Sequence, residues 1–174
     1  MKLISKIIVV ALIGLISCQM AVAQLPAPTP SAKYSNEEIS RMIKTHKRSR
    51  SIDVRPTATL NQHFISDFPK AKDIDWEVGA EIYEVEFEIG WTDYKAYYDK
   101  DGNLLMYKYD LAESELPAVV KNAAFDKYPD SRIDDIDKVI RGTETYYVVE
   151  MEKEERDIKA TFNPEGALIN EIFD

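Results

Sequence analysis

The chain contains one sequence pattern twice, and this repeat constrains the fold more than any other feature. Residues 93–105 read DYKAYYDKDGNLL, and residues 157–169 read DIKATFNPEGALI, 64 positions later. The match continues upstream in two shorter patterns, which pair Tyr83-x-Val85-x-Phe87 with Tyr147-x-Val149-x-Met151, and Phe68-Pro69 with Tyr128-Pro129. Because a repeat of this length indicates two copies of one supersecondary unit, we expect two similar halves, at residues 57–112 and 113–174.

Each copy is predicted to be a helix followed by four antiparallel strands. Apolar residues at helical spacing precede Pro69 and Pro129, and each proline ends its predicted helix. Tyr83, Val85 and Phe87 alternate with glutamates, a period of two that is typical of a strand with one solvated face. The strands are expected near residues 74–76, 81–88, 91–98 and 103–109, and again near 134–140, 145–151, 157–162 and 167–173. Turns are predicted at residues 99–102 and 163–166. The fold class is therefore α+β, with two tandem helix plus four-stranded antiparallel meander units.

Residues 1–23 have the pattern of a secretory signal peptide. Lys2 and Lys6 precede an apolar run at residues 7–16, and Ala21-Val22-Ala23 forms a small-residue cleavage site. Leu15-Ile16-Ser17-Cys18 offers an alternative, a lipobox in which Cys18 would be lipidated. Both interpretations place the protein outside the cytoplasm, in the periplasm or outside the cell. No later apolar stretch is long enough to span a membrane.

Residues 24–56 are predicted to be a proline-containing linker and a basic helical arm. Pro26, Pro28 and Pro30 favour an extended linker, and Ser35 with Glu38 forms a capping box that starts a short helix. From residue 33 to residue 56 there are seven basic and three acidic residues, whereas the whole chain has a net charge of -9. The acidic body disfavours nucleic-acid binding. The basic arm is either solvated, or it contacts lipid headgroups, an acidic partner, or the chain's own acidic body.

No arrangement of residues in the sequence predicts catalysis, a metal site or a cofactor. His46 lies among lysines and arginines, His63 lies beside a core position of a predicted helix, and no second ligand stands at metal spacing. HExxH, G-x-S-x-G and phosphate-loop motifs are absent, and Cys18 is the only cysteine. Asp99, Asp101 and Asn103 surround Gly102 in an order that differs from an EF-hand, so we interpret this segment as a hairpin turn. We therefore predict a protein that is not an enzyme.

The recurring pattern resembles the PepSY-like family of secreted bacterial proteins, which is similar in fold to the beta-lactamase-inhibitor protein. The residues that carry the resemblance are Phe68-Pro69, Trp76, Tyr83-x-Val85-x-Phe87 and Ala96-x-Tyr98-Asp99-x-x-Gly102-x-Leu104, and the second copy repeats them. The resemblance implies that the two sheets join side by side, with helices on one face and an open, concave opposite face. In the inhibitor protein the open face grips an enzyme. These motifs are core and turn residues, so they specify a fold and carry no inhibitory residue.

We expect the open face to bind a protein partner. Residues that alternate with the predicted core positions should face outward, and tyrosines beside charged residues suit protein recognition. The predicted partner-binding residues are Glu84, Glu86, Lys95, Tyr97, Tyr146, Val148, Glu150 and Lys159. The leading hypothesis is an exported, non-enzymatic binding module that inhibits or regulates a hydrolase or peptidase. The alternative is a periplasmic envelope protein that binds a small ligand or calcium.

Overall fold

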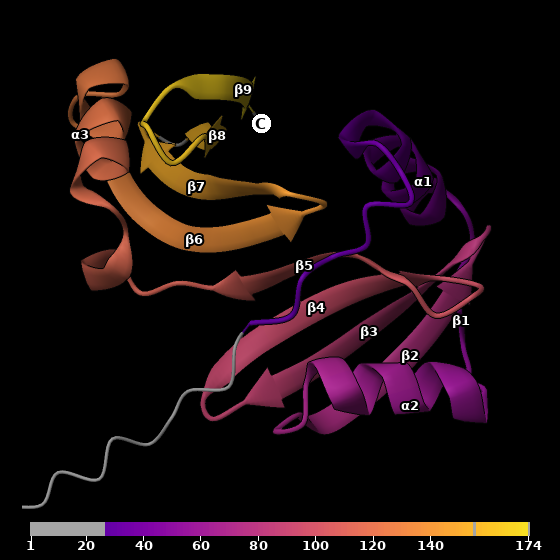
Figure 1. Cartoon of the computed structure of the whole chain (residues 1–174). Helices are drawn as coiled ribbons and strands as arrows, with labels where there is room; N and C mark the ends of the chain where they lie inside the picture. Colours follow the sequence, from indigo (N-terminus) through magenta and orange to yellow (C-terminus); the bar gives the residue numbers. More distant parts are fainter. Residues whose placement is uncertain (1–26, 155, 174) are drawn as a thin grey trace, which may run out of the picture.

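In the described part of the chain, nine antiparallel strands form one sheet in which each strand pairs with its neighbours in the sequence, from β1 at one edge to β9 at the other. The computed structural model describes residues 27–154 and 156–173 (Figure 1). The elements in chain order are α1 (Asn36–Arg48), β1 (Ile52–Asp53), α2 (Ala58–Asp67), β2 (Lys72–Gly79), β3 (Ile82–Ile89), β4 (Thr92–Asp99), β5 (Leu104–Asp110), the 3-10 turn η1 (Glu113–Glu115), α3 (Ala118–Lys127), β6 (Arg132–Arg141), β7 (Glu144–Lys153), β8 (Arg156–Phe162) and β9 (Leu168–Phe173). The mixed α+β class is confirmed.

The element order repeats, since α2 precedes β2 to β5 and α3 precedes β6 to β9. We call these segments the first and the second half. The eight predicted strands are present with shifted ends, and two details differ from the prediction. Strand β1 was not predicted from the sequence; it has two residues, Ile52 and Asp53, and pairs with β2. Trp91 was expected to begin a strand, but it lies in the turn before β4 with its side chain fully exposed.

Helices α2 and α3 cover the same face of the sheet, each over its own half (Figure 1). In the first half, Leu60, Phe64 and Phe68 recur every four residues and pack on Val85 and Tyr98. Leu116, Val120, Ala124 and Tyr128 repeat this spacing around α3, against β6, β7 and β8. Because the side chains of a strand alternate between faces, residues 84, 86, 95 and 97 must point to the opposite side. The face assignment made from the sequence is correct on this point.

The opposite face is not bare, because α1 lies on it. Ile39 and Ile43 of α1 pack against Ile82, Tyr97 and Leu105, and together they form a third core cluster. Ser35 caps the helix as predicted, with its side chain accepting a hydrogen bond from Glu38 N while the Glu38 carboxylate accepts one from Ser35 N. The expectation of an open face is therefore wrong beneath α1. The basic arm contacts the chain's own acidic body, which was one of the alternatives left open.

The segment before α1 passes the end of β5 to reach this face. Ser31 N donates a hydrogen bond to Leu104 O over 2.7 Å, and Pro30 is buried. Lys33 and Tyr34 then bind the carboxylate of Asp99, at 2.9 and 3.1 Å. These contacts attach the arm to the sheet before the helix begins. Residues 27–48 thus touch both faces of the sheet, first beside Tyr107 and then over Tyr97.

The two predicted turns have the same hydrogen-bond pattern. In the first, Gly102 N donates to Asp99 O over 3.1 Å, and in the second Gly166 N donates to Asn163 O over 3.0 Å. The Asp99 carboxylate also accepts hydrogen bonds from Asp101 N and Asn103 N. The Asp99 carboxylate therefore binds the backbone of its own turn and the side chains of the arm. Residues 99–102 form a hairpin turn between β4 and β5, as predicted. Gly102 has a φ of 82°, which explains the glycine there.

Some of the sequence predictions concern residues outside the described ones. These are the signal peptide at residues 1–23, the alternative lipid site at Cys18, and the linker up to Pro26. Within residues 27–154 and 156–173, none of the helices has the length and apolar character needed to cross a membrane.

Candidate protein-binding surface

The eight predicted partner-binding residues lie on the sheet face that carries α1, which we call the α1 face. Cross-strand pairing brings them together in adjacent rows. Glu86 pairs with Lys95, Glu84 pairs with Tyr97, and Glu150 pairs with Lys159. The sequence therefore placed these residues on one face correctly, but it did not indicate which of them are accessible.

Helix α1 covers four of the eight residues. Tyr97 is 0% exposed and Glu84 is 8% exposed, and both lie beneath the helix. Tyr146 and Val148 are partly buried against the same cluster. With α1 in this position, Glu84 and Tyr97 are not available to a partner, and Tyr146 and Val148 are only partly exposed. This corrects the expectation that all eight residues face solvent.

His46 is the polar centre of the contact between α1 and the sheet. Its Nε2 atom lies 2.9 Å from Glu84 Oε2, and its Nδ1 atom lies 3.1 Å from Gly79 O. A carbonyl and a carboxylate both accept hydrogen bonds, so each ring nitrogen of His46 faces an acceptor. No partner of His46 was predicted from the sequence. Its spacing from Ile39 and Ile43, one helical face, was the signal that could have revealed its position.

The Glu84 carboxylate lies between Lys95 and His46. Lys95 Nζ lies 2.7 Å from Glu84 Oε1 and also bonds to the Glu86 carboxylate. Burial raises the pKa of Glu84, but the hydrogen bonds and positive charges of Lys95 and His46 outweigh it, so that the pKa lies below its usual range. Glu84 is thus an anion that joins α1 to β4.

The other four predicted residues, Glu86, Lys95, Glu150 and Lys159, remain accessible to solvent. The Glu86 side chain is 60% exposed and that of Lys159 is 46% exposed. Lys159 pairs with Glu150, and nearby Lys108 pairs with Asp137 over 2.7 Å. The part of the α1 face that the helix leaves uncovered therefore carries alternating acidic and basic side chains. Such a surface discriminates between partners by charge pattern, although each exposed pair contributes little stability.

Asp135, Asp137 and Glu150 form a cluster whose carboxylate oxygens lie within 4.8 Å of one another. Asp137 is buried, and its Oδ1 atom has no hydrogen-bond partner among the described residues. However, the ammonium groups of Lys108 and Lys159 already bind two of the three carboxylates. The cluster is largely compensated by these lysines, and a cation would have to compete with them.

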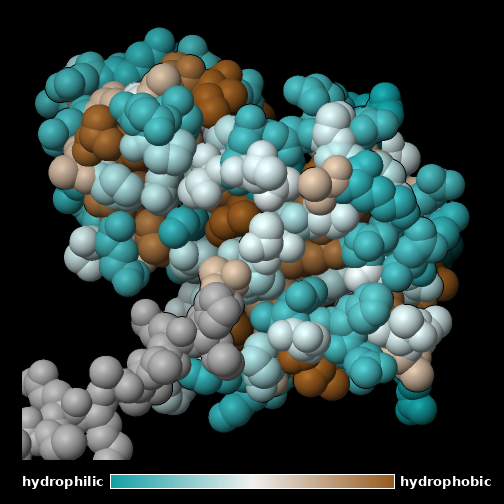
Figure 2. Space-filling model, viewed as in Figure 1, coloured by the Kyte–Doolittle hydropathy of each residue, from teal (hydrophilic) through white to brown (hydrophobic). Residues whose placement is uncertain are grey.

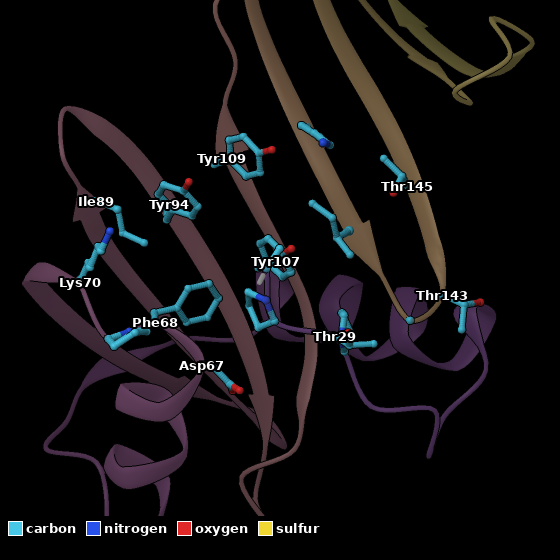
Figure 3. A pocket seen from close by; sticks show the side chains of 17 residues that line it. Thr29, Asp67, Phe68, Lys70, Ile89, Tyr94, Tyr107, Tyr109, Thr143 and Thr145 are labelled. Carbon is cyan, nitrogen blue, oxygen red and sulfur yellow. The ribbon is translucent and has the colours of Figure 1, made fainter. Parts of the chain in front are cut away.

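A groove of about 900 Å³ lies on the other face, between the two halves (Figure 3). It exists because α2 and α3 each cover the strands of their own half, so that β5 and β6 are only partly covered. Phe68, Tyr94, Tyr107 and Tyr109 line one side, and Thr143 and Thr145 line the other. The segment at residues 27–30 forms a further wall. The sequence analysis did not predict this groove, because it arises where the two halves meet.

The groove's aromatic side is a row that crosses three strands. Phe87 stacks on Tyr94, Tyr94 stacks on Tyr109 with ring centroids 4.9 Å apart, and Lys138 Nζ lies 5.8 Å from the centroid of the Tyr109 ring. Burial raises the pKa of Tyr107 to about 12, so its hydroxyl is neutral at physiological pH. The row presents aromatic edges and phenolic hydroxyls beside a cation.

The nine-stranded sheet with its helices places the chain in a known class of protein. A model of the family described as beta-lactamase-inhibitor-like, PepSY-like matches the chain twice, over residues 41–106 and 81–170. The chain belongs to this family, which confirms the resemblance noted in the sequence.

Solved structures of Bacteroides proteins share the fold. A DUF2874 family protein from Bacteroides uniformis is 19% identical with a TM-score of 0.64, and the alignment covers 68% of this chain and 90% of that chain. A BLIP-like protein from Bacteroides fragilis is 22% identical with a TM-score of 0.62, covering 69% and 87%. A DUF2874 family protein from Bacteroides ovatus is 18% identical with a TM-score of 0.63, covering 69% and 89%. At these identities the likeness establishes the fold alone. None of the curated proteins matches the chain.

Proposed function

We propose that this chain is an exported, non-enzymatic binding module that engages a protein partner through the α1 face. The observation that carries the proposal is that this face already binds a helix, α1, through four of the eight predicted residues. A surface that docks one amphipathic helix has the shape and polarity for a protein contact. Glu86, Lys95, Glu150 and Lys159 border α1 and would make the charged part of the contact. The family description as beta-lactamase-inhibitor-like supports the same class of function.

We infer that the partner is a hydrolase or peptidase that the module inhibits or regulates. The encounter would take place in the periplasm or outside the cell, with the leader cleaved after Ala23 or a lipid attached at Cys18. We also infer that residues 57–112 and 113–174 are two copies of one unit, in line with the equal spacing of the α2 and α3 core residues and the matching turns.

Site-specific photocrosslinking in the native envelope tests this function. A photoreactive residue in place of Lys159 should form an adduct with one envelope protein. The same residue in place of Lys121 is the matched control, because Lys121 lies on α3, on the opposite side of the sheet, where it pairs with Glu113. Equal adducts from both positions, or none from position 159, would count against the α1 face. The purified partner is then assayed for hydrolysis with increasing amounts of the module, and unchanged rates would exclude inhibition.

The groove between the halves favours a second candidate, the binding of a small ligand. Its tyrosine edges, phenolic hydroxyls and Lys138 suit a planar aromatic anion. Anilinonaphthalene sulfonate is a fluorescent probe of this class, and it should bind the native chain. Its fluorescence should be lost with Tyr109→Ala and Lys138→Glu, and retained with Lys121→Glu, a charge change outside the groove. If the two groove variants fluoresce like the native chain, the groove is not the site.

A further inference from the structure

We propose that α1 is a displaceable occupant of the α1 face, and that the partner presents an amphipathic helix of the same pattern that takes its place. This inference rests on the function proposed above, and it specifies both the kind of partner and the regulation of the site. Once α1 is displaced, the residues beneath it, which include Glu84 and Tyr97, would contact the partner helix.

The contact of α1 has the form of a helix in a groove. Ile39, Ile43 and His46 are its three buried residues, at positions i, i+4 and i+7 on one side of the helix. This spacing is the one by which bound helices commonly dock in grooves. The surface over the outer side of α1 is mostly hydrophilic, as Figure 2 shows. The helix therefore uses only one narrow stripe to hold the sheet.

The surface beneath α1 is more polar than the cores under α2 and α3. The cluster that α1 and this surface form together has seven buried hydrophobic residues, five of them from the sheet, compared with ten and eleven in the other two clusters. It also contains the Glu84 carboxylate and two buried polar atoms without hydrogen-bond partners among the described residues, the Tyr97 hydroxyl and Arg141 Nε. An unsatisfied buried polar group opposes burial. A partner helix that offers acceptors to these two groups would gain interactions that α1 lacks.

The C-terminal end of α1 meets unfavourable charge. Lys47 follows His46, and its pKa is lowered first by burial and then by the positive charges of Lys108, Lys95 and Lys159, while Glu84 acts in the opposite direction. A helix with an acidic residue at this position would be attracted by the same lysines. Together with the two polar atoms that α1 leaves without partners among the described residues, this charge pattern gives a competing helix interactions that α1 lacks.

Release of α1 requires no rearrangement of the sheet. Residues 49–51 and 31–35 flank the helix without belonging to a strand, and β1 pairs with β2 only through Ile52 and Asp53. The contacts that hold the two ends are polar: Lys33 and Tyr34 with Asp99, and His46 with Glu84. The pairing of β2 to β9 can persist while α1 swings away.

A peptide exchange experiment tests the inference on the full chain without its leader. The probe is a fluorescein-labelled peptide of residues 34–50, and its binding is followed by anisotropy. In the Ile39→Asp/Ile43→Asp variant the chain's own α1 cannot dock, so the probe should bind at least about tenfold more tightly than to the native chain, where the site is occupied. A probe with Lys47→Glu should bind more tightly still. A probe with Ile39→Asp/Ile43→Asp is the control and should not bind.

Hydrogen exchange provides a second measurement that does not depend on the variant. Excess Lys47→Glu probe added to the native chain should increase the exchange of the α1 amides and leave those of α2 unchanged. The inference is wrong if a folded Ile39→Asp/Ile43→Asp variant binds no probe, or if the α1 amides stay protected. Probe binding without a crosslinked envelope protein would contradict the proposed function alone. A crosslinked protein without peptide exchange would contradict this inference alone.

Discussion

Tyr97 and Tyr98 are neighbours in β4 and are both 0% exposed, yet within the described part of the chain a hydrogen bond is formed by the Tyr98 hydroxyl and not by the Tyr97 hydroxyl. Tyr98 points toward α2 and donates to Asp67 over 2.9 Å. Tyr97 points toward α1, where its hydroxyl has no partner among the described residues. Because side chains alternate between the two faces of a strand, the two tyrosines point into different environments. The Tyr98 hydroxyl is hydrogen-bonded there, and the Tyr97 hydroxyl is not hydrogen-bonded to any described residue.

Replacement of each hydroxyl should therefore have opposite effects. We expect Tyr97→Phe to raise the free energy of unfolding by about 1 kcal/mol, because it removes a desolvated group that forms no bond. Tyr98→Phe should lower it by about 1 kcal/mol, because the Asp67 carboxylate loses its donor. Urea unfolding followed by the fluorescence of buried Trp76 measures both. A loss of stability in Tyr97→Phe would mean that its hydroxyl is satisfied after all.

Acid should loosen α1 before it unfolds the strands. The pKa of Glu84 lies below its usual range because Lys95 and His46 outweigh the effect of burial. The pKa of Asp99 is likewise lowered, since the hydrogen bonds from Asn103, Lys33 and Tyr34 outweigh burial. A carboxylate with a lowered folded pKa stabilises the fold above its unfolded pKa, and this contribution is lost as the pH falls through the folded value.

We accordingly expect the attachment of α1 to weaken progressively below pH 4.5, the ordinary pKa of glutamate. Hydrogen exchange of the α1 amides at pH 7 and pH 4, corrected for intrinsic rates, provides the measurement. Glu84→Gln is the matched variant, and it should remove most of the pH dependence that is confined to α1. The same dependence in Glu84→Gln would assign the effect to Asp99.

Gly102 should be far more sensitive to substitution than Gly90. Both have positive φ, 82° and 71°, so alanine is strained at either position by about 1–2 kcal/mol. A Cβ atom on Gly102 would also lie 2.4 Å from His63 Nδ1, whereas a Cβ on Gly90 meets nothing within 4 Å. His63 Nδ1 donates to Gly102 O over 2.8 Å, and this bond would have to shift. Thermal unfolding of Gly102→Ala and Gly90→Ala should show the larger loss for Gly102, and equal losses would contradict the close approach.

Calcium should not raise the melting temperature of the native chain. Lys108 and Lys159 already bind two carboxylates of the Asp135, Asp137 and Glu150 cluster, and an added cation must compete with them. Calorimetric titration with millimolar calcium chloride should give no binding heat. In contrast, Lys108→Met leaves Asp137 uncompensated and should create weak binding. Calcium binding by the native chain would contradict this prediction and support the alternative of a calcium-binding envelope protein.

The strand pattern and the assignment of side chains to faces could be predicted from the amino-acid sequence. The period of two in β3, and its recurrence in β7, depends only on local backbone geometry, so Val85 and Val149 could be assigned to the core without coordinates. The two turns could also be predicted from local sequence, because each four-residue turn has a glycine, Gly102 or Gly166, at the position with positive φ. Helix ends at Phe68 and Tyr128 followed from the prolines that come next.

What covers each face of the sheet could not be predicted from the sequence. Whether α1 lies in solvent or over Tyr97 depends on contacts between residues far apart in the chain, such as His46 with Glu84, and no periodicity encodes them. The tyrosine groove likewise exists only where the first half meets the second. Local patterns report the backbone and its alternation. The burial of a side chain instead depends on which apolar surfaces pack against each other in the folded chain, and these surfaces come from segments far apart in the sequence.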